Sequence, residues 1–344
     1  VVGKNQIQVL TSMNKVSVLV AVYNAAPFLP KCLESLTNQT FANIKIVCVD
    51  DCSTDDSLSV LNEYARQDDR IKVVERSVNG GIAKARNSGL SVADGDFVCM
   101  VDADDWLATD AIAQAVKVFQ DHPLSDCVLL RFVLAYQEGN VYRLEDYPCE
   151  EFECLSGEEA FLKSLDWRIH GIYMVRMSIQ QRFRYDESAR FYSDENTARL
   201  HYFVSREVRQ CAGIYYYLQH SASATHAVSG NRFDSIKAKE SLRQWLQQLS
   251  ASPQVIADFE SDRWLNVVDM YFYYFRYRHK GLSIADAAYG LSEIHRAWRS
   301  IDISKLPSRL RRKFGYCPLR FSWWAFRLQE ELYFWLRSLL HRNG

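Results

Sequence analysis

The sequence predicts an α/β protein in which a mostly parallel sheet carries helices on both faces. From Val16 to about Tyr136, short apolar runs alternate with amphipathic segments, which is the pattern of strands joined by crossover helices. The runs are apolar at nearly every position, as strands buried on both faces are. Polar residues follow several of the strands, at the edge where ligands of such sheets bind. These three observations define the fold class.

Each predicted element follows from the spacing of its apolar residues. The predicted strands are Val16–Val22, Ile44–Val49, Ile71–Val74, Phe97–Val101 and Val128–Val133. The helices between them, with apolar residues every three or four positions, are Phe28–Leu36, Asp56–Tyr64, Ile82–Val92 and Ala111–Phe119. Further helices are expected at Thr197–Val204, Ser241–Leu249 and Asp262–Tyr277.

The composition of the 344-residue chain excludes several classes of protein. Hydrophobic residues make up 48%, which is enough to bury a core and argues against general disorder. A formal net charge of −1 argues against a globally basic nucleic-acid binder. The sequence has no stretch of about 18 uncharged apolar residues, so no membrane-spanning helix is expected. The nine cysteines, in a chain without a recognisable secretory leader, are expected to be reduced core thiols of a cytosolic protein.

The strand ends are rich in acids. Val49 leads into Asp50-Asp51-Cys52-Ser53-Thr54-Asp55, and Val101 leads into Asp102-Ala103-Asp104-Asp105. Two residues apart on an extended segment, Asp102 and Asp104 are expected to point the same way and to share a Mg²⁺ or Mn²⁺ that bridges two phosphates. The structural alternative is that Asp105 caps a helix beginning near Trp106, and both interpretations can hold together.

A glycine pair precedes the helix that begins at Ile82. Gly80 and Gly81 permit close backbone approach, and the helix start carries Lys84 and Arg86 within its first turns. Such a helix start favours an anion, and a diphosphate suits it. An ordinary asparagine-glycine turn is the alternative.

In their order and spacing these motifs resemble glycosyltransferase family 2, the inverting nucleotide-sugar transferases with a GT-A fold. The resemblance rests on residues 16–24, 49–55, 79–81 with 85–87, and 95–105. It covers about residues 15–225, more weakly after 136. It implies an N-terminal extension at 1–14 and a catalytic domain at 15–230. Within that domain, 15–125 would bind the nucleotide sugar and 126–230 would bind the acceptor.

The resemblance implies roles for the strand-end residues. The residues expected to flank the nucleotide base are Ala21, where the family usually has proline, Tyr23 and Asn24. Asp51 would accept a hydrogen bond from the imide N–H of the base, which favours UDP, although guanine also carries such a donor. Asp104 would be the direct ligand of a Mg²⁺ or Mn²⁺ ion. Asp102 would lie nearer the donor's ribose or sugar.

The resemblance also places a general base about ninety residues beyond the metal motif. Glu195 is the expected base and Asp194 the second choice, although the family more often has Asp at the basic position. The alternative is that both acids merely favour the start of a helix capped by Ser193. Attack of the deprotonated acceptor hydroxyl in a single displacement would invert the anomeric carbon.

Residues of the expected acceptor half are less specific. Trp167 could stack on a sugar ring and His170 could orient a hydroxyl, but either could equally be a core residue, and for Trp167 alone the core is favoured. The family usually carries an arginine after the aromatic run 215–217; here it is absent, and His220 or His226 would have to substitute in contacting phosphate.

The C-terminal region, 231–344, is expected to be helical and rich in aromatic and basic residues. Residues 305–344 hold nine Lys and Arg against two acids, a balance of +7. Basic residues mixed with aromatics favour contact with an anionic membrane surface. The alternatives are packing on the catalytic domain or on another subunit. No module for nucleic-acid binding is visible.

The sequence as a whole predicts an inverting glycosyltransferase that moves a sugar from a nucleotide-sugar donor to a glycan or lipid-linked acceptor. It is expected in the cytoplasm, with peripheral contact at the inner face of the cell membrane. One alternative is a nucleotidyltransferase, although the glycine-rich basic loop normal for that class is missing after the first strand. The other is a non-catalytic sugar- or lipid-binding protein that retains the fold, against which the intact set of acids argues.

Overall fold

The structure is a computed structural model that describes residues 14–139, 141–189, 192–220 and 228–340. His226 lies outside the described residues. Contacts divide the chain into two compact units. Unit 1 comprises Val1–Glu187 with Thr197–Ser221, and unit 2 comprises Ser188–Asn196 with Ala222–Gly344. The domain boundaries at 14 and 230 stay predictions.

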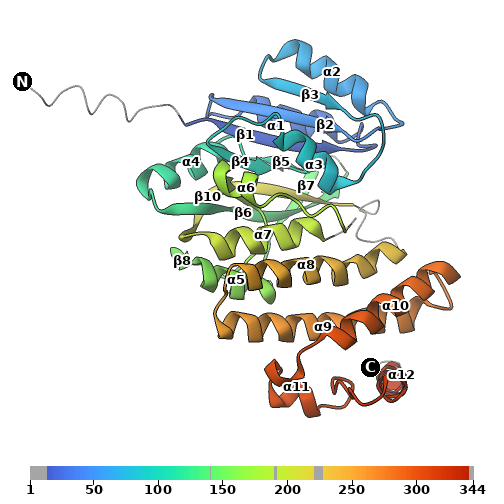
Figure 1. The fold of residues 1–344 in the computed structure, drawn as a ribbon. Coiled ribbons are helices and arrows are strands. Elements are labelled where there is room, and N and C mark those ends of the chain that lie inside the picture. The colour runs from blue at the N-terminus through green and yellow to red at the C-terminus, as the bar shows by residue number, and fades with distance from the viewer. Residues whose placement is uncertain (1–13, 140, 190–191, 221–227, 341–344) are drawn as a thin grey trace, which may run out of the picture. The chain divides into compact units, whose positions relative to one another are not determined.

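Unit 1 is built on one mixed sheet with the strand order β3-β2-β1-β4-β9-β6-β10-β5 (Figure 1). Strands β3, β2, β1 and β4 form consecutive parallel pairs, and β6 pairs in parallel with β10, so the prediction of a mostly parallel sheet is confirmed. The strands are β1 (Val16–Val22), β2 (Ile44–Asp50), β3 (Ile71–Glu75), β4 (Phe97–Met100), β5 (Trp106–Leu107), β6 (Ser125–Glu138), β7 (Val141–Asp146), β8 (Cys154–Ser156), β9 (Tyr173–Arg176) and β10 (Glu207–Gln219).

Helices cover both faces of this sheet, which explains the unbroken apolar runs. On β1, Val18 and Val20 belong to one core cluster and Leu19 to another, because alternate side chains of a strand point to opposite faces. The helices of this unit are α1 (Leu29–Thr37), α2 (Ser57–Gln67), α3 (Ile82–Leu90), α4 (Ala111–Asp121), α5 (Gly157–Leu165) and α6 (Met177–Arg182). Helix α7 (Ser193–Val204) has its first turn in unit 2 and the rest, from Thr197, in unit 1.

The expectation that Asp105 caps a helix beginning near Trp106 is wrong. Trp106 and Leu107 form the short strand β5, which pairs with Tyr215 and Tyr216 of β10. The Trp106 ring stacks on Tyr216 with centroids 5.3 Å apart. These cross-strand contacts come from a segment about 110 residues away, so local helix signals could not reveal them.

The cysteines are confirmed as free thiols, but not all are core residues. Cys32, Cys48, Cys99 and Cys127 are buried, whereas Cys154 is exposed. Burial raises the pKa of the Cys48 and Cys99 thiols to about 12.

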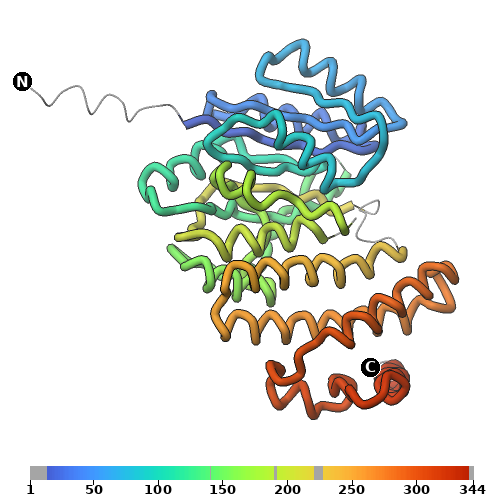
Figure 2. Tube along the Cα trace, viewed as in Figure 1, coloured from blue at the N-terminus to red at the C-terminus, as the bar shows by residue number. Residues whose placement is uncertain are grey.

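Unit 2 is helical, as predicted. Its α-helices are α8 (Asp234–Gln248), α9 (Pro253–Tyr277), α10 (Ile284–Ser300), α11 (Ser308–Arg312) and α12 (Trp323–Leu340). Ser252 and Ser283 accept backbone N–H bonds at the starts of α9 and α10, as helix N-caps do. Helices α8 and α9 lie side by side (Figure 2), and Trp264, Trp298 and Phe326 fill the core. Among the described residues, no helix is both long enough and apolar enough to cross a bilayer.

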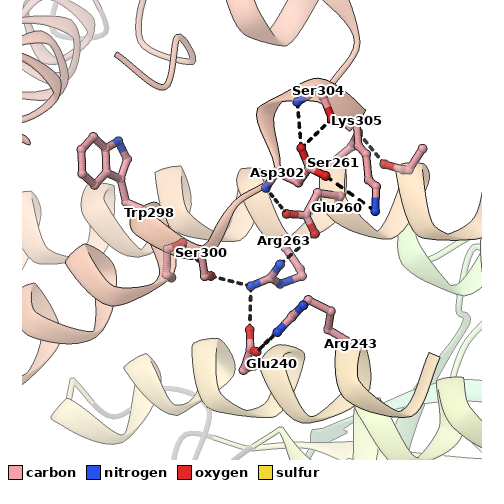
Figure 3. A network of polar contacts seen from close by, with 12 residues as sticks. Glu240, Arg243, Glu260, Ser261, Arg263, Trp298, Ser300, Asp302, Ser304 and Lys305 are labelled. Carbon is pink, nitrogen blue, oxygen red and sulfur yellow. Dashed lines mark hydrogen bonds and ion pairs between the residues drawn. The ribbon is translucent and has the colours of Figure 1, made fainter. Parts of the chain in front are cut away.

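A buried arginine joins three parts of unit 2 (Figure 3). Arg263 of α9 is 5% exposed, and its guanidinium donates to Glu260 (2.7 Å), to Glu240 of α8 (2.7 Å) and to the Ser300 hydroxyl at the end of α10 (2.7 Å). The other oxygen of Glu260 accepts from the backbone N–H of Asp302 (2.6 Å). Because every charge in this cluster has a partner, the network fixes the helix ends without an isolated buried charge.

Glu330 of α12 gives the helical unit a predicted pH dependence. Its side chain is fully buried, one oxygen accepts from the Gln329 amide (3.0 Å), and its Oε2 has no hydrogen-bond partner in the described residues. Burial raises the pKa of this carboxyl to about 8. The folded chain therefore holds this proton more tightly than the unfolded chain, whose glutamate pKa is about 4.3. The free energy of unfolding should therefore fall as pH rises from about 4.5 to about 8, by up to about 1.4 kcal/mol per pH unit.

Glu330→Gln keeps the shape of the side chain and removes the titration. The variant should lose less thermal stability than the wild type when pH rises from 5 to 8. Thermal unfolding of both chains at pH 5, 6.5 and 8 measures this difference. Parallel stability-against-pH curves for the two chains would contradict the prediction.

Candidate active site

The loops after β1 and β2 are bound to each other. The side-chain oxygen of Asn24 accepts from the backbone N–H of Thr54 (2.8 Å), and the Ser53 hydroxyl accepts from the N–H of Asn24 (3.1 Å). Asn24 has a φ of 50°, in the left-handed region that asparagine tolerates better than most residues. Tyr23 is 52% exposed beside it, so its ring is available to a ligand. The motif after β2 thus shapes the loop after β1.

Asp51, at the end of β2, is buried and bonded within the protein. Its carboxylate accepts from Arg76 (2.6 Å), from the backbone N–H of Gly80 (3.1 Å) and from that of Gly81 (2.7 Å). Gly81 has a φ of 86°, a conformation that favours glycine. Gly80, expected to permit close backbone approach of a ligand, donates its N–H to Asp51 in this structure. Lys84, one turn into α3, is exposed.

Asp102 and Asp104 lie in a turn after β4, not on an extended segment as expected. The N–H of Asp105 donates to the carbonyl of Asp102 (3.0 Å), which closes the turn. Asp102 accepts from the guanidinium of Arg86 (2.7 Å), which is 5% exposed. Asp104 lies 2.9 Å from the ring Nε2 of His220. Each acid of the predicted metal pair therefore has its own nitrogen partner.

Asp105 holds this turn against β10. Its buried carboxylate accepts from the Tyr215 hydroxyl (2.6 Å) and from the N–H of Leu218 (2.8 Å), and the same hydroxyl accepts from the N–H of Asp102 (3.1 Å). Burial and the neighbouring Asp102 and Asp104 carboxylates raise the pKa of Asp105 well above its usual range. Because Leu218 is fixed in this way, the end of β10 brings His220 to Asp104.

The donor set suits a divalent cation. Asp104 Oδ2 and His220 Nε2 lie 2.9 Å apart at hydrogen-bond distance, so a carboxylate oxygen and a ring nitrogen, both potential metal ligands, are side by side. In the described part of the chain, no three His, Cys, Asp or Glu side chains gather as a ready metal site. The remaining ligands would therefore be phosphate oxygens and water. The sequence suggested His220 only as a phosphate contact. Its position shortly after the aromatic run 215–217 was the signal that could have indicated a metal ligand.

The predicted base residues lie in the first turn of α7. This helix begins at Ser193, four residues before its predicted start, and includes both Asp194 and Glu195. A side-chain oxygen of Asp194 accepts from the N–H of Glu195 (2.9 Å). Asp194 is exposed and Glu195 is partly exposed.

Of the two acceptor candidates, Trp167 is not a core residue. Its side chain is 48% exposed, it has a φ of 62°, and the Arg199 guanidinium lies 5.8 Å from its ring centre. Trp167 follows α5, which ends at Leu165, and its half-exposed ring is open to a ligand.

His170, in contrast, is 3% exposed and lines a pocket of about 870 Å³. Its Nδ1 accepts from the N–H of Ile172 (3.2 Å), and burial lowers its pKa to about 4. The ring is therefore neutral near pH 7, with its proton on Nε2. Phe132, Tyr147 and Glu151 also line this pocket.

The family described as Glycosyl transferase family 2 matches residues 17–194, just over half of the chain. The chain belongs to glycosyltransferase family 2. The predicted family is thus confirmed. Among relatives of this family 2 chain is the putative glycosyltransferase EpsH of Bacillus subtilis, 39% identical over 123 residues, which are 36% of this chain and 35% of EpsH. The chain therefore matches only about a third of the length of that relative.

Two solved structures resemble this family 2 chain in fold. Staphylococcus aureus TarS 1–349 in complex with UDP-GlcNAc has a TM-score of 0.71 at 20% identity, over 93% of this chain and 91% of that one. The mannosyltransferase PcManGT of Pyrobaculum calidifontis, in complex with GDP-Man and Mn²⁺, has a TM-score of 0.53 at 17% identity, over 86% and 78%. At these identities the likeness confirms the predicted fold, including the C-terminal helical region.

Proposed function

We propose that this family 2 enzyme transfers a sugar from a UDP-sugar to an acceptor hydroxyl, with inversion at the anomeric carbon. The observation that carries the proposal is the turn after β4, where Asp102 and Asp104 each meet a nitrogen partner fixed by the fold. Strand β1 pairs in parallel with both β2 and β4, so the carboxyl ends of the three strands share one edge of the sheet. Asp51 and Tyr23 lie at this same edge, as a nucleotide-sugar site requires.

The nucleotide is proposed to bind over the joined loops after β1 and β2. The half-exposed Tyr23 ring offers a face to the base, and Ala21 and Asn24 are proposed to flank the base as well. Asp51 already accepts from three donors, so a bond from the base imide would use its remaining acceptor capacity. UDP is favoured because TarS is seen with UDP-GlcNAc, although PcManGT is seen with GDP-Man.

Asp104 and His220 are proposed to hold a Mg²⁺ or Mn²⁺ ion. Such an ion would neutralise negative charge on the departing diphosphate, as a Lewis acid does. Asp102, fixed by Arg86, is proposed to face the donor's ribose or sugar. Because Arg86 is buried against Asp102, its proposed role is to position that acid, whereas the exposed Lys84 remains available to the diphosphate.

The acceptor is proposed to be a glycan or a lipid-linked glycan. The pocket beside His170 has aromatic walls, and the neutral ring can donate from Nε2 to a sugar hydroxyl. The exposed Trp167 ring suits stacking on a sugar. A cytoplasmic location stays a prediction.

Donor turnover by the full-length chain tests the proposed function. Purified enzyme is incubated with UDP- and GDP-sugars, and the released nucleotide is measured with Mg²⁺, with Mn²⁺ and after chelation by EDTA. We expect UDP release that needs a divalent ion and returns when the ion is added back. If the enzyme binds sugar nucleotides but releases none with any metal or offered acceptor, the proposal fails and a binding protein is favoured.

The two base candidates can be separated by neutral isosteres. Glu195→Gln should lower sugar transfer by about a hundredfold or more, since general-base catalysis typically contributes 10²–10⁴. Asp194→Asn should have a smaller effect and serves as the matched control. Initial rates of sugar transfer at saturating donor measure both. The reverse order of the two effects would assign the base to Asp194.

A further inference from the structure

Helix α12 is apolar on two opposite faces. Phe326 and Phe334, with Glu330 between them, are buried on one face in the core of unit 2. Large apolar side chains also cover the opposite face, within an arc of about 120° at 100° per residue. They are Trp324 (71% exposed), Leu328 (70%), Leu332 (46%), Trp335 (52%), Leu336 (40%) and Leu339 (42%). We call these six side chains the outer face of α12.

The charges that border the outer face are basic. Both acids of the last forty residues are neutralised, because Glu330 is buried with a raised pKa and Glu331 accepts from Arg278 (2.7 Å). The guanidinium of Arg327 lies 5.2 Å from the ring centre of Trp324, where a cation–π contact keeps it beside the apolar surface.

The segment before α12 adds more positive charge. Helix α11 and the residue after it expose four cations, and within the described ranges no carboxylate forms an ion pair with them. They are Arg309, Arg311, Arg312 and Lys313. Phe321, two residues before α12 begins, is 81% exposed and adds a further apolar side chain to the surface of this segment.

We propose that the outer face of α12 docks on an anionic lipid surface, with the helix lying in the plane of the interface. Leucine and tryptophan side chains beside arginines match the headgroup boundary, where apolar groups enter the acyl region and cations meet lipid phosphates. A second copy of this chain suits the face less well. A symmetric contact would bring two basic borders together, and like charges repel.

Flotation with lipid vesicles tests this docking with the full-length chain. Wild type should float with vesicles of phosphatidylglycerol and phosphatidylcholine, bind at least tenfold less to pure phosphatidylcholine, and lose binding as salt rises. Trp324→Glu with Trp335→Glu should reduce binding to anionic vesicles at least tenfold. The matched control is Ile284→Glu on α10, because Ile284 is 92% exposed and lies outside the outer face. This control should bind like wild type.

Two further measurements separate the remaining outcomes. Arg311→Glu with Arg312→Glu should lower binding to anionic vesicles and leave the weak binding to neutral vesicles unchanged. If circular dichroism shows that the double tryptophan variant is unfolded, the single variant Leu328→Gln replaces it. This variant should show a smaller loss of binding to anionic vesicles. Wild-type chain that stays unbound, or an outer-face variant that floats like wild type, would overturn the proposal. A concentration-dependent dimer that the same variants abolish, without vesicle binding, would assign the face to a second copy. Donor turnover in solution is scored separately, so this outcome is independent of the proposed reaction.

Discussion

Asp104→Ala should lower donor turnover at least about a hundredfold and leave the fold intact. The carboxylate is partly exposed and belongs to neither core cluster, so its removal costs the 2.9 Å contact with His220 but opens no cavity in the core. A metal ion at this position would stabilise the leaving diphosphate by several kcal/mol, and each 1.4 kcal/mol or so is a factor of ten in rate. Nucleotide release at saturating metal and donor measures the loss, and circular dichroism checks the fold.

Asp69→Ala is a matched control for this variant. Asp69 is an exposed acid in the turn before β3, outside the proposed site, and its removal should leave turnover within about twofold of wild type. His220→Ala should weaken metal binding, so a higher metal concentration is needed for half-maximal rate. Undiminished turnover in Asp104→Ala would remove this residue from the chemistry.

Arg263→Met should destabilise the chain by about 3–5 kcal/mol. The substitution preserves much of the apolar stem but leaves the buried Glu260 and the partly buried Glu240 without their shared cation. Loss of one partner of a buried ion pair is costly because the other charge is left desolvated. Equilibrium unfolding in urea measures the change, together with the slope that reports cooperativity.

Arg299→Met is the matched control, since Arg299 is exposed on the neighbouring helix α10. This control should change stability by less than about 0.5 kcal/mol. Combining Arg263→Met with Glu240→Gln and Glu260→Gln should recover part of the lost stability, because the uncompensated charges are then gone. Equal unfolding midpoints for Arg263→Met and wild type would show that the network of Figure 3 contributes nothing to stability.

The helices and strands of unit 1 were well predicted because their signals are local. Strand β1 has its predicted bounds, Val16–Val22, and α3 begins at its predicted residue, Ile82. Residues apolar at nearly every position of β1 require burial on two faces, and the two core clusters supply it. The exception at Trp106 has a tertiary cause, because its strand partner belongs to β10.

The sequence by itself determined the fold class, the family and the gathering of acids at the ends of β2 and β4. Parallel strands place their carboxyl ends on one edge whatever their loops do, so the order of the motifs was sufficient. Only the tertiary structure decided the partners of those acids. Asp104 meets His220, 116 residues away, because Asp105 fixes the end of β10, and no local pattern encodes such a contact.

The tertiary structure also decided which apolar residues are buried. The sequence favoured the core for Trp167, yet the residue is 48% exposed in the fold. The apolar residues of α12 cover both of its faces, and only packing decides that Phe326 and Phe334 enter the core while Trp324 and Trp335 face outward. Hydrophobicity in a sequence shows that a side chain gains by leaving water. The folded arrangement decides which neighbours are near enough to cover it.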